Sequence, residues 1–417
     1  MNAVLSLIER RYPLFYDLGT RHLRLVLAAF AGLYLAIAGA MWAELIATSD
    51  DLFTRAGPII GGDFIVFQHA AERAGDDDLA ALYEMKTLKA ELQARYPGRG
   101  EMNFGWMYPP TMFLLVTPFG GAPYLAAYAA WVIAFAAIFL IVTHRLWADR
   151  WAMTFAITAP PFFQAIITGQ NGLLTASLLA LAGGFAERRP ALAGIAAGLL
   201  TIKPQLGVLI PLAFIAGGCW RAFAWAAATA ITLAAASLAA FGPDLWRAFV
   251  SGLLAHGGRM ATEGFPFHKL VTPFGFAAKL GLSPAMTSAV QLLATVSLAA
   301  FVAIVWRRVK APDLRLAALS TAAIMATPYA FYYEFVIAVP AMIVIARRAV
   351  ATGWLKGEKL SLVLLWILTL QSPGGDAEPS LSVSALAAML ALAIVARRAM
   401  PATGVRFASA RSPAPAG

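Results

Sequence analysis

Long apolar runs, separated by charged or Gly- and Pro-containing turns, make up most of the sequence. Because a transmembrane helix needs about 20 mostly apolar residues, the longer runs can each cross a bilayer. Shorter runs can do so where the bilayer thins or where the helix stops at a cavity. The pattern predicts an all-α polytopic membrane protein with about 12 transmembrane helices. The runs lie near residues 25–46, 122–146, 151–168, 171–186, 190–203, 205–219, 221–241, 284–306, 315–328, 334–346, 359–372 and 381–396.

The polar remainder of the chain is concentrated in two loops and a tail. We expect external loops at about 47–110 and 242–283, the first of them carrying short amphipathic helices. Residues 111–121 are apolar, but a proline and two glycines within them favour a re-entrant half-helix over a full span. The Pro/Ala/Ser-rich residues 401–417 are expected to be a disordered cytoplasmic tail. Residues 1–400 are therefore interpreted as one membrane domain.

The composition agrees with a membrane protein. The 417 residues are 60% hydrophobic and only 13% charged, well below the charged share of soluble domains. In such a protein a net charge of +10 is expected to report topology, and we predict no nucleic-acid partner. Cys219 is the only cysteine, which excludes an intrachain disulfide and a cysteine-cluster metal site. The five histidines show no spacing typical of a zinc pair.

The charge distribution gives the chain an orientation. Four arginines precede or open the first apolar run, which predicts an uncleaved signal-anchor with a cytoplasmic N-terminus. Alternating the runs from there places most of the 32 Lys and Arg residues on the cytoplasmic side, with few of the 22 acids. The C-terminus then also lies inside. The acidic stretch GGDFIVFQHAAERAGDDD, residues 61–78, lies outside, where few bases are expected.

Asp63 opens that stretch directly after a Gly-Gly pair. Its position alone favours an N-cap, because an aspartate before a helix can accept backbone N–H bonds. A catalytic carboxylate is the alternative. The helix that follows is expected to be amphipathic, with Gln68 and Glu72 facing water. The three acids at 76–78 are expected to form a solvated turn, since their tandem spacing differs from that of a calcium loop.

Five polar stretches interrupt the apolar chain, and all of them fall at the outer ends of predicted runs. Polar groups at membrane depth are costly unless they line a cavity or meet partners. We therefore expect the five to share one polar cavity that opens outward. They are DFIVFQHAA (63–71), MYPP (107–110), TGQNG (168–172), TIKPQ (201–205) and TPYAFYYE (327–334).

Gln170 and Asn171 offer paired side-chain donors and acceptors, which suit sugar hydroxyls. The other polar residues that these stretches contribute include Tyr108, Gln205, Tyr332, Tyr333 and Glu334. Simpler interpretations remain open: a helix start at the double proline, a Gly-Asn turn, and an aromatic belt around an acid that needs a partner or water. Lys203 either snorkels towards the membrane surface or binds an anion there.

The loop HGGRMATEGFPFHKL, residues 256–270, is the most basic external patch. It carries His256, Arg259, His268 and Lys269 among glycines, phenylalanines and a proline. A solvated interfacial loop is the simpler interpretation. The alternative is a lid that contacts a lipid phosphate.

The order of these motifs resembles that of glycosyltransferase family 87. The resemblance runs from about Asp63 to Glu334 and rests on DFIVFQHAA, YPP, GQNG, IKPQ and TPY…YYE. It implies a GT-C-type membrane enzyme, related to mannosyltransferases that use polyprenyl-phosphate-mannose. It also implies a bacterial-type cytoplasmic membrane with the active site facing outward, and an inverting displacement with Asp63 as general base. The family often has Asp or His where this chain has Glu334, so the role of that residue is left open.

The mechanism that the resemblance implies assigns further roles. Lys203 is the first choice for the donor phosphate, followed by Arg259, Lys269 and the histidines His256 and His268. The donor sugar or the acceptor would be oriented by Tyr108, Gln170, Asn171, Gln205, Tyr332, Tyr333 and Glu334. The expected partners are membrane lipids, a polyprenyl-monophosphate-sugar donor, and a lipid-linked or glycan acceptor. Neither a cofactor nor a metal is expected, because a monophosphate leaving group carries less charge than a nucleotide diphosphate.

Two other classes compete with the enzyme. About twelve spans and an outward polar cavity also suit a transporter or lipid flippase, and a structural or assembly protein is the third alternative. The two halves of the chain show no matching broken helices, which speaks against alternating access. The unequal external loops also suit a one-sided active site better.

Overall fold

The computed structural model describes residues 20–99, 102–257, 266–370 and 383–400, and every named element in these ranges is helical. The elements are α3 (Thr20–Ala47), α4 (Phe64–Glu72), η1 (Leu79–Tyr83), α5 (Met85–Arg95), α6 (Thr111–Val116), η2 (Thr117–Phe119), α7 (Tyr124–Leu146), α8 (Arg150–Thr158), α9 (Pro160–Ile167), α10 (Gly172–Phe185), α11 (Pro190–Leu199), η3 (Leu200–Ile202), α12 (Pro204–Gly207), α13 (Ile210–Gly217), α14 (Trp220–Gly257), η5 (Phe267–Lys269), α15 (Pro273–Lys279), α16 (Pro284–Arg308), α17 (Pro312–Ala326), η6 (Tyr332–Ile337), α18 (Ala338–Thr352), α19 (Glu358–Leu368) and α20 (Val383–Ala399).

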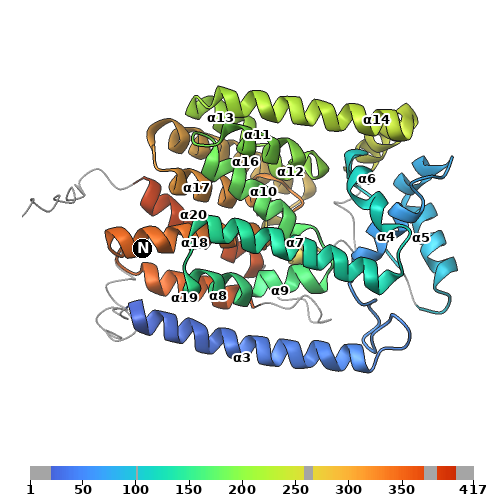
Figure 1. Cartoon of the computed structure of the whole chain (residues 1–417), viewed down its shortest axis with the longest axis horizontal. Coiled ribbons are helices and arrows are strands. Elements are labelled where there is room, and N and C mark those ends of the chain that lie inside the picture. Colours follow the sequence, from blue (N-terminus) through green and yellow to red (C-terminus); the bar gives the residue numbers. More distant parts are fainter. Residues whose placement is uncertain (1–19, 100–101, 258–265, 371–382, 401–417) are drawn as a thin grey trace, which may run out of the picture.

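Most of the longer helices run along the long axis of the molecule (Figure 1). The helices α3 and α14 form its two long edges, and α4 and α5 sit together at one end (Figure 1). Five helical segments in the described ranges are long and apolar enough to cross a membrane: 21–47, 124–146, 220–255, 284–308 and 332–352. The other predicted runs are also helical, but they form shorter or broken segments, so the count of about twelve spans stays a prediction.

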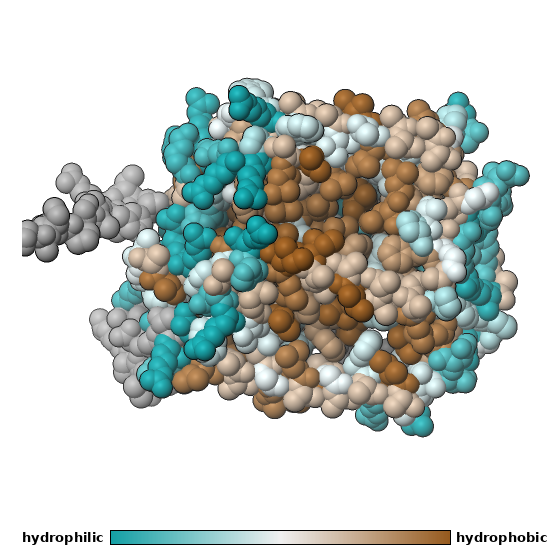
Figure 2. All heavy atoms as spheres, in the orientation of Figure 1, coloured by the Kyte–Doolittle hydropathy of each residue, from teal (hydrophilic) through white to brown (hydrophobic). Residues whose placement is uncertain are grey.

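Apolar residues form a belt across the middle of the face shown in Figure 2, and hydrophilic residues gather at both ends of the long axis. Large apolar side chains stand exposed on the spanning helices, among them Ile133 on α7 at 68% and Leu293 on α16 at 70% exposure. Such a belt is unfavourable in water and favourable in hydrocarbon. The chain is therefore an all-helical membrane protein, with the bilayer normal along the long axis.

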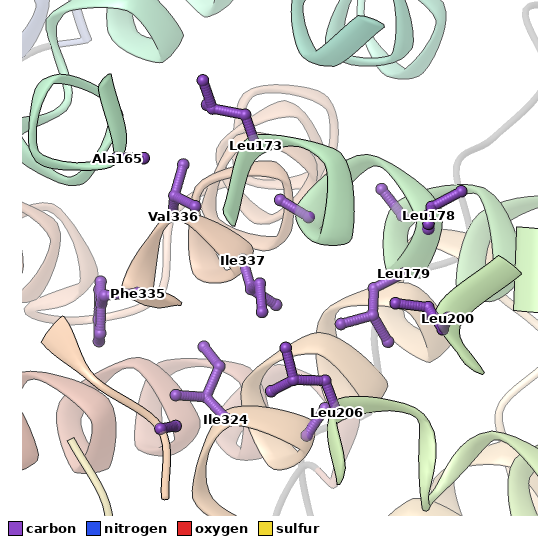
Figure 3. Close-up of a cluster of buried hydrophobic side chains, with 14 of the residues drawn as sticks. Ala165, Leu173, Leu178, Leu179, Leu200, Leu206, Ile324, Phe335, Val336 and Ile337 are labelled. Atoms are coloured by element: carbon purple, nitrogen blue, oxygen red, sulfur yellow. The ribbon is translucent and has the colours of Figure 1, made fainter. Parts of the chain in front are cut away.

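The core packs α10 against α17 and η6 (Figure 3). Leu179 of α10, Ile324 of α17 and Ile337 of η6 are at most 1% exposed. A glycine lets two of these helices approach closely, because a Cβ at Gly183 would lie 2.8 Å from the Cα of Leu316. This rigid centre carries the polar turns at one end of the bundle.

One expectation about the external segments is wrong. Gln68 is only 2% exposed and donates to the Ala122 carbonyl at 2.8 Å, so it does not face water. The reason is that Gly120 of the following turn packs directly on α4: a Cβ there would lie 2.5 Å from the Ala71 carbonyl oxygen. The loop bounds 242–283 stay a prediction; helix α14 has a kink at Gly242, with a φ of 76°, and a second helical segment follows it up to Gly257.

Residues 111–121 form the six-residue helix α6 and the 3-10 turn η2, with Pro118 inside the turn. At about 1.5 Å of rise per residue these segments are too short to cross a bilayer. A full span over these residues is therefore excluded, and re-entry into the membrane stays a prediction.

Candidate active site

Two glycine turns place Asp63 at one end of the bundle. Gly61 and Gly62 have φ values of 83° and 50°, and Gly169 has a φ of 61°. A Cβ at Gly169 would lie 2.4 Å from the Gly61 carbonyl oxygen, so only glycine allows the two turns to touch. The backbone N–H of Asp63 donates to the Thr168 carbonyl at 2.9 Å. The DFIVFQHAA and TGQNG stretches are thereby joined.

Helix α7 supports both turns with two tyrosines. The Tyr124 hydroxyl donates to the Ile60 carbonyl at 2.7 Å, and the Tyr128 hydroxyl donates to the Ile166 carbonyl at 2.8 Å. Their rings also pack around Phe64, with ring centroids 5.6 Å apart in each case. The sequence analysis missed these two residues. Their i, i+4 spacing at the start of an otherwise apolar helix is the signal that could have revealed them.

Asp63 occupies the position before α4, but its carboxylate does not cap that helix. Instead, Oδ2 accepts a hydrogen bond of 2.7 Å from Nε2 of Gln170. Within the described ranges, no residue donates a hydrogen bond to the other oxygen, Oδ1. The N-cap interpretation is therefore wrong: one carboxylate oxygen is held by an amide, and the residue as a whole is partly exposed.

Burial raises the pKa of the Asp63 carboxyl above its ordinary value. The Gln170 hydrogen bond and the charges of Lys203 and Lys269 act in the opposite direction, and burial outweighs them. A raised pKa brings a carboxylate closer to the basicity that a general base needs near neutral pH. The environment of Asp63 is therefore suited to proton transfer and not only to a structural ion pair.

Tyr108 extends the hydrogen-bonded chain. Its hydroxyl donates to Oε1 of Gln170 at 3.1 Å, which fixes the amide so that Nε2 points at Asp63. Its own carbonyl accepts from the Tyr83 hydroxyl at 2.7 Å. Tyr108 therefore orients the Gln170 amide, and this amide in turn orients the Asp63 carboxylate.

Lys203 is buried, at 4% exposure, and bridges two of the other stretches. Its Nζ lies 2.5 Å from Oε1 of Glu334 and donates to Oδ1 of Asn171 at 3.0 Å. It also lies 5.5 Å from the ring centre of Tyr108 and 5.8 Å from that of Tyr333, both within cation–π range. The snorkelling interpretation is wrong for this lysine, because its charge is paired inside the protein.

Glu334, whose role the sequence left open, is the ion-pair partner of Lys203. It is 1% exposed, and its second oxygen accepts from the Phe331 backbone N–H at 3.0 Å. The five polar stretches thus meet, as expected, at one end of the bundle. We call the residues that join them the polar cluster: Asp63, Tyr108, Gln170, Asn171, Lys203 and Glu334.

The basic loop reaches the same end through its last residues. Leu270 forms an isolated β-bridge with Phe331, and the Val271 backbone N–H donates to the Ala330 carbonyl at 2.9 Å. This pairing carries η5, with His268 and Lys269, to the η6 side of the site. Lys269 is close enough for its charge to act on the pKa of Asp63.

The remaining predicted site residues either make no hydrogen bond to the polar cluster within the ranges that the structure describes or have side chains outside those ranges. Tyr332 is partly buried and packs edge-on against Tyr333, with ring centroids 5.3 Å apart. Gln205 is exposed on α12 and, in the described part of the chain, makes no hydrogen bond to the polar cluster. His256 belongs to the last turn of α14, and Arg259 lies outside the described residues. Among the described residues, no group of three or more His, Cys, Asp or Glu is placed to hold a metal ion, which leaves the expected metal-free chemistry to experiment.

Comparison with known proteins gives one family. The model of glycosyltransferase family 87 matches residues 106–331, more than half of the chain, and this range includes four members of the polar cluster. Asp63 lies well before the matched range, and Glu334 lies just after it. No curated protein and no solved structure gives a match. With an apolar belt, spanning helices and a match of this extent, the chain belongs to glycosyltransferase family 87 and is a membrane-embedded glycosyltransferase.

Proposed function

We propose that this enzyme transfers a hexose, with mannose favoured, from a polyprenyl-monophosphate-sugar donor to a hydroxyl of a lipid-linked or glycan acceptor. Asp63 acts as the general base of an inverting displacement. The observation that carries this proposal is the environment of its carboxylate: its pKa is raised by burial, one oxygen is held by Gln170, and the other accepts no hydrogen bond from a described residue. The match to the family supplies the reaction class, and the donor and acceptor come from the resemblance described above.

In the proposed step the acceptor hydroxyl oxygen attacks the anomeric carbon from the face opposite the phosphate. Its proton passes to Oδ1 of Asp63, and the bond between the anomeric carbon and the phosphate oxygen breaks. The electron pair of that bond leaves with the polyprenyl monophosphate. Since the amide of Gln170 is uncharged, it fixes the carboxylate with less loss of basicity than a salt bridge to an arginine would cause.

Negative charge grows on the phosphate as it leaves, so a cation near that position favours the transition state. Lys269 is our first candidate for this contact, with His268 beside it, because both lie on η5 at the edge of the site. Lys203 was the first choice from sequence, but its Nζ is engaged by Glu334 and Asn171. We propose that Lys203 positions the polar cluster, and that Arg259 and His256 supply further cations from the same loop.

Sugar hydroxyls would be oriented by Tyr108, Gln170 and the two tyrosines of η6. Asn171 and Glu334 would act through Lys203, and Gln205 would contact the acceptor from the exposed face of α12. We propose that neither a metal nor a cofactor takes part. The GT-C architecture, the placement of the site on the outer face of a cytoplasmic membrane and the cytoplasmic termini complete the proposal. The apolar belt in Figure 2 and the charge asymmetry of the sequence support this arrangement.

The test is turnover by purified protein in lipid nanodiscs, with polyprenyl-phosphate-mannose as donor and membrane glycolipid extracts as acceptors. Mass spectrometry of the product should show a mass increase of one hexose. Asp63→Asn should reduce product formation by about two orders of magnitude or more, and Asp77→Asn, at an exposed acid of the same loop, should not. Turnover of the donor that is equal in the wild type and Asp63→Asn would overturn the proposed role of Asp63.

A further inference from the structure

A cavity of about 280 Å³ lies at the end of the bundle away from Asp63. It is enclosed by the ends of α7, α10, α17 and α18. The opposite ends of these helices reach the active-site end: Tyr124 at the start of α7 bonds to the residue 60 carbonyl, and Asn171 precedes α10. From Tyr124 to the cavity residue Leu146 a helix rises roughly 33 Å, about the thickness of the hydrocarbon core.

Arginines dominate the polar lining of this cavity. Arg348 forms a two-fold hydrogen-bonded pair with Asp313, at 2.8 and 2.7 Å, which balances one charge. Arg347 donates to the Leu146 carbonyl at 2.5 Å, an uncharged partner. Arg145 and Arg188 are exposed and make no ion pair with any residue that the structure describes. Three positive charges therefore face one cavity without an acid to balance them.

The walls between the arginines are apolar. They consist of Leu146, Phe185, Leu316 and Val344. The start of α17 also lines the cavity through Pro312, and a helix N-terminus favours negative charge nearby. The arginines and the apolar residues line the same cavity. It therefore combines an anion-binding rim with a surface suited to hydrocarbon.

We infer that this cavity binds the phosphate headgroup of an anionic membrane lipid, with the start of its acyl chains against the apolar walls. Planar guanidinium groups match the oxygens of a phosphate and bind them through charge-assisted hydrogen bonds. Basic pockets between transmembrane helices are a recurring form of such sites. A soluble phosphate shares the headgroup chemistry, but it would leave the apolar walls without a partner.

The test compares two variants of equal charge at the same end of the molecule. Arg145→Gln/Arg188→Gln removes the two unpaired arginines of the cavity. Arg307→Gln/Arg308→Gln removes two exposed arginines at the end of α16 that do not line it. Native mass spectrometry in detergent would count bound phosphatidylglycerol against phosphatidylcholine, and thermal unfolding would follow the same titration. A parallel arm uses inorganic phosphate without lipid.

We expect the wild type and the Arg307/Arg308 variant to bind phosphatidylglycerol saturably and to gain thermal stability. The cavity variant should bind it roughly tenfold more weakly or worse, since one hydrogen bond to a charged group is worth about that factor. Should the double variant be unstable, Arg188→Gln alone gives the same comparison. Equal retention by the two double variants would overturn the site. Equal stabilisation by inorganic phosphate would overturn its assignment to a lipid.

Discussion

Replacing Asp63 by asparagine separates the chemistry of this residue from its structural contribution. Asparagine is nearly isosteric, and its side-chain oxygen can still accept the hydrogen bond from Gln170, now 2.7 Å from Oδ2. The change removes the negative charge and the ability to take a proton. A general base contributes about 10²–10⁴-fold to the rate. Transfer should therefore fall by about that factor.

The raised pKa fixes the sign of the effect on stability. A carboxyl whose pKa is higher in the folded protein binds its proton more tightly there, so ionisation weakens the fold. The contribution of the protonated form is fully present below the pKa of the unfolded chain, and it is lost as pH rises through the folded pKa. Each unit of the shift corresponds to about 1.36 kcal/mol. At neutral pH the asparagine variant should therefore be at least as stable as the wild type, and this advantage should disappear in acid.

Two measurements check this reasoning. Thermal unfolding of both proteins in nanodiscs across the acidic to neutral range should show the variant's advantage growing with pH. The pH profile of wild-type kcat/KM should show an acidic limb above the usual range of aspartate, because burial raises the pKa of Asp63. An asparagine variant that is much less stable at neutral pH, yet retains turnover, would refute the assignment and return Asp63 to a structural role.

Four further predictions follow from the site. Gly169→Ala should reduce transfer strongly, measured by donor turnover, because the added Cβ would lie 2.4 Å from a backbone oxygen in the turn beneath Asp63. Lys203→Met should lower the free energy of unfolding by about 3–5 kcal/mol, since it leaves Glu334 buried and unpaired; Lys203→Met/Glu334→Leu should recover stability in denaturant titrations without recovering turnover. Cysteine at Gly75 should react with an impermeant thiol reagent from outside in spheroplasts, whereas cysteine at Lys310 should react only after lysis. Chelation by EDTA should leave transfer unchanged, and a loss that magnesium or manganese restores would contradict metal-free chemistry.

The sequence predicted that the polar stretches gather at one end, because alternating spans place every second turn on the same side of a membrane. It could not predict which side chains pair. Gln170 and Asp63 are separated by 107 residues, and their hydrogen bond depends on the contact between two glycine turns. Lys203 and Glu334 each had several local interpretations, and only the packing of α10 and η6 around them selects the ion pair.

The error at Gln68 has a physical origin. Gln68 was expected to face water because helical periodicity distinguishes two faces of α4 without showing what covers either of them. In the structure Gly120 and its neighbours cover the polar face, and the Gln68 amide meets a backbone carbonyl. The apolar run expected to end at residue 241 does meet a break there, because Gly242 is not helical. Pro243 then begins a second helical segment, a role that proline fills well at a first turn.

The polar cluster also shows how Asp63 can act as a base although a lysine lies nearby. A cation beside a carboxylate lowers its pKa and weakens it as a proton acceptor. Lys203 does lower the pKa of Asp63, but burial outweighs this effect, and the lysine itself is paired with Glu334, with the two charged atoms 2.5 Å apart. The direct partner of Asp63 is an uncharged amide, held in turn by an uncharged tyrosine. Of the two lysines that lower this pKa, Lys269 makes no ion pair with a residue that the structure describes, and a donor phosphate entering near η5 would neutralise its charge. Donor binding should therefore raise the pKa of Asp63 further, which predicts that the acidic limb of kcat lies at higher pH than that of kcat/KM.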